Sequence, residues 1–350
     1  MEEQNNVPKR RKTTIKISIN EISEATKKSM ILRIITSVVL AIIVIPALFI
    51  GGWYFLALVF IAAVLAVFEI MRGTKISKRY WYIYFIVIVS TLAVIFWNFF
   101  KQNFAANVSS GYRFFDVTKW IVEVGFETIS VSSFLLATIL IGLFFLLVWD
   151  KHFNFDIAAY LFLLILFSGL GFQSIVFLRL YPKFVAVADP PIQSNLNFIS
   201  SSFLLIYIFL GTVITDIGGY FIGVLFGKHK MIPRISPNKT WEGFAGGVFF
   251  SILFSLLFAL IVSWAGHPIL PFLSHNEWYY LVLLSVIMPL AANIGDLFFS
   301  ATKRHLNIKD YGFIIVGHGG ILDRIDSLLL VGIVTSMLII LINNGWSLLV

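Results

Sequence analysis

The segment "GHGGILDRIDSLLLVGIVTSMLIILI", Gly317–Ile342, joins a polar, glycine-rich motif directly to a long apolar run. Its first half holds four chemically active side chains, which are His318, Asp323, Arg324 and Asp326. Its second half is almost wholly apolar, as expected of a helix that crosses a membrane. A carboxylate within a membrane helix is by default a functional-site candidate, so this group of charges at the start of the apolar run indicates a functional site near the membrane surface.

The composition of the chain is typical of a membrane protein. Its 350 residues are 59% hydrophobic and 13% charged, with a mean hydropathy of +0.92. A soluble domain is about 45–50% apolar and about 25% charged. The chain has no cysteine, which excludes disulfides and thiolate metal sites. The formal charge of +8 is typical of basic cytoplasmic loops near anionic lipid, not of nucleic-acid binding.

Nine apolar segments predict an all-α, polytopic membrane helix bundle with about nine transmembrane helices. They lie near 31–51, 53–71, 81–99, 131–149, 157–179, 203–227, 244–264, 278–298 and 327–345. Most of the 26 Lys and Arg residues fall in the N-terminal tail and in the loops that would share its side of the membrane. Positive charge concentrates in cytoplasmic loops, so the N-terminus is predicted to be cytoplasmic.

The chain is expected to have three regions. Residues 1–30 form a basic cytoplasmic tail without a signal-peptide cleavage pattern. Residues 31–200 hold five spans and a long outside loop at 100–130. Residues 201–350 hold four spans and most of the polar side chains, so this part is predicted to be the catalytic region.

The sixth span, "GTVITDIGGYFIGVLFG", Gly211–Gly227, has a small residue at every fourth position. Such a stripe lets two helix backbones approach closely, so it predicts tight helix packing. Asp216 lies inside this span, where a carboxylate is by default a functional-site candidate. The alternative for Asp216 is a structural pair with Lys or Arg.

The following inside loop, "KHKMIPRISPNKTWEG", is basic, rich in hydroxyl groups and stiffened by two prolines. A rigid loop of this kind at a membrane face suits a phosphate or a nucleotide. Its candidate binding residues are Ser236, Lys239 and Thr240. The alternative is the ordinary positive charge of a cytoplasmic loop.

The eighth span ends in a polar stripe made of Asn293, Asp296, Ser300 and Lys303. Spacings of three and four residues place these side chains on one face of a helix. A carboxylate at depth with a cation at the rim is expected where a helix lines a hydrated cavity.

Three carboxylates are candidate ligands for one or two Mg²⁺ ions: Asp296, Asp323 and Asp326. Hard oxygen ligands are the kind that Mg²⁺ prefers. Asp323 and Asp326 lie three residues apart, on one face of the helix that should begin after Gly320. Acidic residues at a helix N-terminus also favour the helix dipole, an alternative that explains one carboxylate better than the whole set.

The motif Ser300–Asp326, "SATKRHLNIKDYGFIIVGHGGILDRID", resembles the signature of the phosphatidate cytidylyltransferase family, also called CDP-diacylglycerol synthase. The run "TDIGGYFIGVLFGKHKMIPRISPNKTWEG" resembles a second block of that family. The resemblance implies that CTP and phosphatidic acid are converted into CDP-diacylglycerol and pyrophosphate with Mg²⁺. It also implies metal ligation by Asp296, Asp323 and Asp326, and a homodimer.

The residues and the resemblance together assign roles. Catalytic roles go to Asp296, Lys303, His318, Asp323, Arg324 and Asp326. Substrate-binding roles go to Ser236, Lys239, Thr240, Arg304, Lys309, Asp310, Asp216 and Asn293. The cations would hold phosphate charge, and a site facing the cytoplasm would admit CTP from water and the lipid from the side. A bacterial cytoplasmic membrane is the expected location.

Three other functions are alternatives to a cytidylyltransferase. A cation-coupled transporter could use Asp216 and Asp296 as ion sites, but it predicts two related halves, whereas the polar groups here lie in one half. A different lipid transferase would make a different product. A scaffold without chemistry leaves the polar stripe of the eighth span unexplained.

Overall fold

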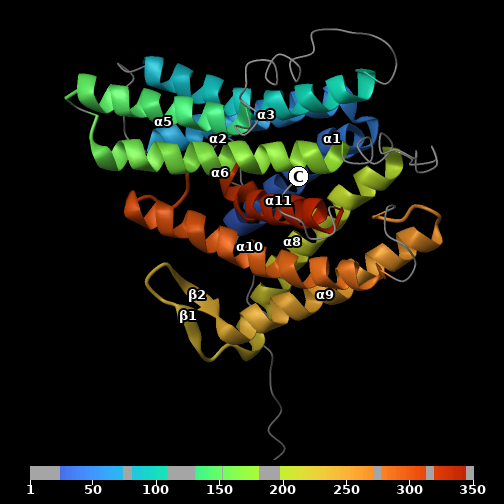
Figure 1. The fold of residues 1–350 in the computed structure, drawn as a ribbon. Coiled ribbons are helices and arrows are strands. Elements are labelled where there is room, and N and C mark those ends of the chain that lie inside the picture. The colour runs from blue at the N-terminus through green and yellow to red at the C-terminus, as the bar shows by residue number, and fades with distance from the viewer. Residues whose placement is uncertain are drawn as a thin grey trace, which may run out of the picture.

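The computed structural model describes residues 24–73, 81–108, 131–151, 153–180, 198–270, 277–312 and 319–343. These residues form a bundle of helices and one small β-hairpin (Figure 1). The helices are α1 (Glu24–Ile50), α2 (Gly52–Gly73), α3 (Trp81–Val108), α5 (Val131–Trp149), α6 (Phe155–Leu180), α8 (Phe198–Phe226), α9 (Trp241–Trp264), α10 (Tyr279–His305) and α11 (Leu322–Asn343). Each of the nine predicted apolar segments overlaps one of these helices.

Six of the described helices are long and apolar enough to cross a membrane. These spans are Gly52–Gly73, Phe155–Arg179, Ser200–Phe226, Trp241–Trp264, Tyr279–His305 and Leu322–Ile342. Shorter apolar stretches lie in α1, α3 and α5. Many large apolar side chains of α1, α8 and α9 are exposed, as a lipid-facing surface requires. The chain is therefore an α-helical membrane protein, while the number of nine spans and the cytoplasmic N-terminus stay predictions.

The predicted rigid loop after α8 is a β-hairpin. Strand β1 (Lys230–Ile232) pairs antiparallel with β2 (Ser236–Thr240). Pro233 lies in the connecting turn, and Pro237 is tolerated in β2 because each strand of a two-stranded sheet is an edge strand. The other described elements are all helices, in agreement with the predicted all-α membrane helix bundle, to which this short hairpin is added.

Helices α8 and α9 pack closely through small residues, as the sixth span predicted. A Cβ on Gly218 would lie 3.3 Å from the Cα of Gly247, and a Cβ on Gly247 would lie 2.5 Å from the carbonyl oxygen of Thr215. The Ser251 hydroxyl donates to the carbonyl of Gly211 at 2.8 Å. The pair carries the hairpin at its tip, since β1 and β2 connect the end of α8 to the start of α9 (Figure 1).

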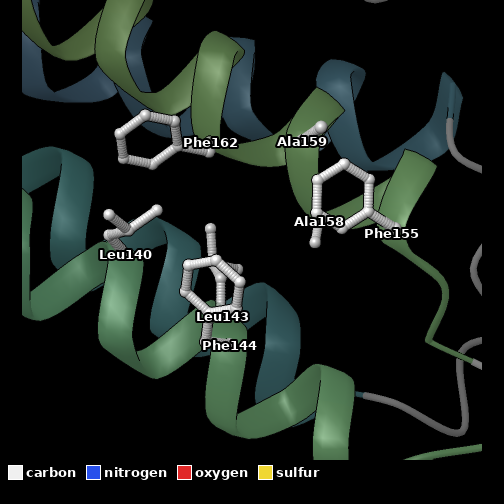
Figure 2. Close-up of a pocket in the computed structure, with 7 residues that line it drawn as sticks. All are labelled: Leu140, Leu143, Phe144, Phe155, Ala158, Ala159 and Phe162. Atoms are coloured by element: carbon white, nitrogen blue, oxygen red, sulfur yellow. The ribbon is translucent and has the colours of Figure 1, made fainter.

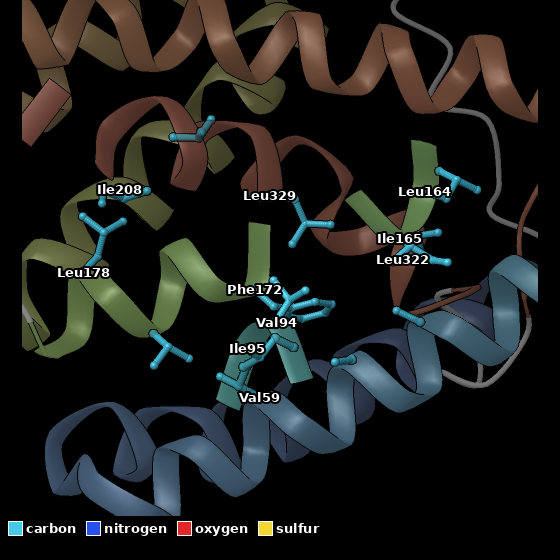
Figure 3. Close-up of a cluster of buried hydrophobic side chains, with 14 of the residues drawn as sticks. Val59, Val94, Ile95, Leu164, Ile165, Phe172, Leu178, Ile208, Leu322 and Leu329 are labelled. Atoms are coloured by element: carbon cyan, nitrogen blue, oxygen red, sulfur yellow. The ribbon is translucent and has the colours of Figure 1, made fainter. Parts of the chain in front are cut away.

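A buried apolar core joins the two halves of the chain (Figure 3). It contains Val59 of α2, Val94 of α3, Leu164 of α6, and Leu322 and Leu329 of α11. Helix α11 packs against α6 on one side and against α10 and α8 on the other. Helix α11 is therefore packed between elements from both halves of the chain.

Arg179 ties three helices together at the end of α8 that lies far from the hairpin. Its buried guanidinium donates to the carbonyls of Leu48 at 2.7 Å and Phe49 at 3.3 Å. It also donates to the Ser201 hydroxyl at 2.6 Å. These bonds connect α1, α6 and α8.

Two predicted regions lie partly outside the described residues. Of the basic tail, only the residues from Glu24 onward are described, and they begin α1. Of the predicted outside loop at 100–130, the part up to Val108 continues α3 as a helix. Residues 109–130 lie outside the described residues, so the outside loop stays a prediction.

Candidate active site

Two lysines form ion pairs with carboxylates at the hairpin end of the bundle. Lys239 Nζ of β2 lies 2.5 Å from Asp296 Oδ2 of α10. Lys303 Nζ of α10 lies 3.0 Å from Asp323 Oδ1 and 3.9 Å from Asp326 Oδ2, both of α11. The two groups lie near each other, since the Asp326 carboxylate is within range of electrostatic repulsion by Asp296. These five residues, all predicted from the sequence, form the lysine–aspartate cluster.

Asp216 of α8 belongs to the surroundings of this cluster. It interacts electrostatically with Asp296 and with Lys239. Asp326 in turn interacts with both Asp296 and Asp216. Asp216 of α8 therefore lies within electrostatic range of carboxylates on α10 and α11.

Asp323 is bonded mainly to the backbone. Its Oδ2 accepts hydrogen bonds from the N–H of Tyr311 at 2.9 Å and from the N–H of Gly320 at 3.3 Å. The bond to Gly320 lies at the N-terminus of α11, as in the alternative of a capping carboxylate. Asp323 therefore orders the segment before α11, while its other oxygen meets Lys303.

The polar stripe of α10 lies on one side of the helix, as its spacing predicted. The Ser300 hydroxyl donates to Asp296 Oδ1 at 3.4 Å. The buried Asn293 amide donates to the carbonyl of Pro289 in its own helix at 2.9 Å. Asp296 and Lys303 therefore reach other elements of the cluster, whereas the bond described for Asn293 stays within α10.

Tyr311 closes the cluster on the side of Lys303. The Lys303 ammonium lies 5.6 Å from the centre of the Tyr311 ring, within the range of a cation–π interaction. Burial raises the pKa of the Tyr311 hydroxyl, so this group stays protonated and donates to the Phe299 carbonyl at 3.4 Å. Tyr311 is not among the residues predicted from the sequence, because no sequence pattern around it indicates its contact with Lys303.

The hairpin brings Lys239 and Ser236 to the end of α10. Arg304 Nε donates to the carbonyl of Ile235 at 3.3 Å, which fastens the hairpin to α10. Thr240 is buried, and its hydroxyl accepts from the N–H of Gly243 at 3.1 Å as the N-cap of α9. The structure therefore gives Thr240 a structural role besides the predicted binding role.

Other predicted residues lie at the edge of the cluster or outside the described chain. Arg324 is exposed on the first turn of α11. Lys309 and Asp310 are exposed in the segment that follows α10. His318 lies outside the described residues.

Sequence reasoning missed Glu69, a buried carboxylate of α2 that bonds to the backbone at the start of α11. It is the only acidic residue of this apolar span. A lone carboxylate in a span is by default a functional candidate, so its position alone could have drawn attention to it. Its partner lies about 250 residues away in sequence, which no local pattern reveals.

A pocket between α5 and α6 is purely apolar (Figure 2), and none of its lining residues belongs to the cluster. It is lined by Leu140, Leu143, Phe144, Phe155, Ala158, Ala159 and Phe162. It has no polar group to bind a phosphate or a metal, so it does not define the active site.

The donor chemistry of the cluster fits Mg²⁺, but its geometry requires change. Asp296, Asp323 and Asp326, with Asp216 within electrostatic range, offer hard oxygen ligands. Across the described ranges, no three Asp, Glu or His side chains stand close enough together to hold one ion. Lys239 and Lys303 now pair with these carboxylates, so a metal would have to displace their ammonium groups.

The fold and the cluster define a polytopic membrane protein with a charged site at one end of its helices. The chain belongs to the cytidylyltransferase family, whose model matches residues 31–342. A phosphatidate cytidylyltransferase of Bacillus subtilis is 32% identical over 306 residues, covering 85% of this chain and 93% of that protein. One of Staphylococcus epidermidis is 29% identical over 302 residues, covering 86% and 96%. One of Mycobacterium leprae is 37% identical over 172 residues, covering 41% and 50%.

Proposed function

We propose that the chain is a phosphatidate cytidylyltransferase, which converts CTP and phosphatidic acid into CDP-diacylglycerol and pyrophosphate. The observation that carries this proposal is the lysine–aspartate cluster, which meets at the hairpin end of α10 and α11. Relatives with this name cover most of the chain, and the family model covers nearly all of it. A transporter would not need paired cations and carboxylates gathered at one membrane face.

For this reaction the protein must position the two substrates and neutralise the charge of their phosphates. An oxygen of the lipid phosphate attacks the α-phosphorus of CTP, and the bond from that phosphorus to the leaving pyrophosphate breaks. The attacking phosphate is ionised, so no strong base is required, and charge neutralisation dominates. Lys239 and Lys303 suit this task, since each is held at the cluster and can exchange a carboxylate for a phosphate oxygen.

We infer that Asp296, Asp323 and Asp326 hold Mg²⁺, with Asp216 as a further carboxylate of the same region. Bound Mg²⁺ would neutralise phosphate charge and make the α-phosphorus more electrophilic. The protein's own part is to aim carboxylates from separate helices and to move two lysines onto phosphates. Exposed Arg304 and Arg324 would bind the remaining phosphate charge at the rim.

We place the site at the cytoplasmic face of a bacterial membrane. Exposed Lys228 and Lys230 lie just before and at the start of the hairpin, as expected of a cytoplasmic segment. CTP would reach the cluster from water, and phosphatidic acid would reach it from the lipid. The homodimer stays a prediction from the family resemblance, to be checked by the mass of the purified protein in detergent.

The test measures transfer of label from CTP into lipid. Purified protein in detergent is given phosphatidic acid, Mg²⁺ and CTP labelled at the α-phosphorus, and the lipid phase is counted. We expect label in CDP-diacylglycerol that disappears with EDTA and returns when Mg²⁺ is added in excess. Asp326→Asn keeps the side-chain shape and removes the charge, and it should lower the rate at least about 100-fold.

The matched control is Asp156→Asn, which removes an exposed carboxylate at the start of α6. It should retain the rate of the unaltered protein. Folded protein that leaves the lipid phase unlabelled under these conditions would contradict the proposed function. Full activity in EDTA would contradict the metal, while leaving the transfer reaction in place.

A further inference from the structure

Glu69 reaches from α2 to the start of α11 and uses both of its carboxylate oxygens there. Oε1 accepts from the N–H of Ile321 at 2.9 Å, and Oε2 accepts from the N–H of Leu322 at 2.8 Å. Only 2% of Glu69 is exposed. The first N–H groups of a helix have no partner within it, and a negative charge is favourable at that end. Glu69 therefore caps α11 from another part of the chain.

Two glycines leave the space that this carboxylate fills. A Cβ on Gly312 would collide with the Glu69 carboxylate. A Cβ on Gly320 would lie 2.6 Å from Glu69 Oε2 and 2.9 Å from Asp323 Oδ2. The backbone before α11 is therefore fitted closely around two carboxylates, one from α2 and one from α11.

The two carboxylates bind adjoining parts of one backbone segment. Glu69 takes the N–H groups of Ile321 and Leu322, while Asp323 takes those of Gly320 and Tyr311. The second oxygen of Asp323 meets Lys303. The position of the Asp323 carboxylate relative to Lys303 thus depends on the backbone at Ile321 and Leu322, which Glu69 binds.

We propose that Glu69 is a positioning residue for the transfer reaction, which fixes the start of α11 so that Asp323 and Asp326 meet Lys303. This rests on the proposed function. Glu69 accepts the backbone N–H groups of Ile321 and Leu322, and its carboxylate also interacts electrostatically with Asp323, so it acts on the cluster chiefly by holding this backbone. An error of about 1 Å in such a group can cost about 100-fold in rate.

A carboxylate has the two acceptor oxygens that the N–H groups of Ile321 and Leu322 require. Glutamine has the same shape, but it offers one acceptor oxygen and one NH₂ group, which would point a donor at a backbone N–H. Glu69→Gln therefore breaks one of the two bonds and leaves the core around α2 filled. Leu322 and its neighbours in the core keep their apolar contacts in this variant.

The first measurement is hydrogen–deuterium exchange of the full-length protein in detergent, followed by mass spectrometry. We expect Glu69→Gln to speed exchange at least about tenfold in peptides covering 319–324, with no change across α8 and α9. The second measurement is the rate of lipid labelling, which should fall about 10–100-fold in kcat with a smaller change in the KM for CTP.

Ser201→Ala is the matched control, because it removes a buried polar partner of Arg179 at the other end of the bundle. It should lower thermal stability without lowering kcat. Gly320→Ala is the second variant, since its methyl group would press on the same two carboxylates. It should reproduce both effects of Glu69→Gln.

Two results would overturn the proposal. One is unchanged exchange at 319–324 in Glu69→Gln, which would show that the carboxylate does not hold the segment. The other is faster exchange together with a kcat no lower than that of Ser201→Ala, which would make Glu69 merely structural. If the unaltered protein makes no CDP-diacylglycerol, the proposed function fails, whereas the exchange result still reports on Glu69.

Discussion

At the scale of single residues, Lys303 has the most demanding role in the site. It is the cation between Asp323 and Asp326, and all three side chains are no more than 12% exposed. Water screens such a group little, so the ammonium contributes strongly to stabilising both charges, beside the backbone N–H groups that Asp323 also accepts. The same ammonium must also be able to leave for a phosphate if the proposed reaction is right.

Lys303→Met should therefore damage both folding and activity. Removal of one partner from a buried ion pair costs about 3–5 kcal/mol, because the remaining charge is left unpaired. We expect a lower midpoint of thermal unfolding and at least an about 100-fold lower rate of lipid labelling. Lys303→Met combined with Asp323→Asn should be less destabilised than the two single variants would suggest if their effects added.

Lys151→Met is the control, since Lys151 is exposed in the connection between α5 and α6. It should unfold and react like the unaltered protein. An Lys303→Met protein with normal stability would show that the two carboxylates do not need this cation.

The sequence predicts four of the five members of the cluster because helix periodicity is a local property. The spacing within α10 placed Asp296 and Lys303 on one side, and the spacing within α11 did the same for Asp323 and Asp326. Which lysine meets which carboxylate depends on how the helices dock, and no local pattern contains that. The bond between Glu69 and α11 was missed for the same reason.

At the scale of elements, the pair of α8 and α9 carries two parts of the site. Asp216 lies on α8, and Lys239 lies on the hairpin that joins α8 to α9. The repeat of small residues predicted close packing on α8, but the partner helix could not be read from it. The sequence predicts a rigid loop at the hairpin, because two prolines stiffen its backbone, and proline is tolerated in the observed strand because both strands of a two-stranded sheet are edge strands.

Gly247→Ala should test whether this close packing places the hairpin. Its Cβ would lie 2.5 Å from the backbone oxygen of Thr215, which cannot move aside without shifting α8. We expect a lower midpoint of thermal unfolding and at least an about tenfold lower labelling rate, because Lys239 would no longer reach Asp296 in the same way. Gly142→Ala is the control, since a Cβ there meets nothing within 4 Å.

A contrary result is easily recognised. If Gly247→Ala retained both the stability and the labelling rate of Gly142→Ala, the approach of α8 to α9 would not set the geometry of the site.

At the scale of the whole molecule, the two halves of the chain depend on each other. The residues of the cluster all come from 201–350, whereas α6 packs against α11 and Glu69 of α2 bonds to its first turn. The expected division into an N-terminal and a catalytic region therefore describes where the charges lie. It does not describe a part that could work alone, because Glu69 and the shared core cross the boundary.

The side of the membrane on which the site opens can be measured directly, because the chain has no cysteine of its own. Arg234→Cys introduces a thiol at the turn of the hairpin, and Ala265→Cys introduces one directly after α9, both at exposed positions. The 24 residues of α9 span about 36 Å, enough to separate the two thiols by a bilayer. A membrane-impermeant maleimide should label Ala265→Cys in spheroplasts and Arg234→Cys only in inside-out vesicles. The reverse pattern would put the cluster on the outer face, where cytoplasmic CTP could not reach it, and would contradict the proposed orientation.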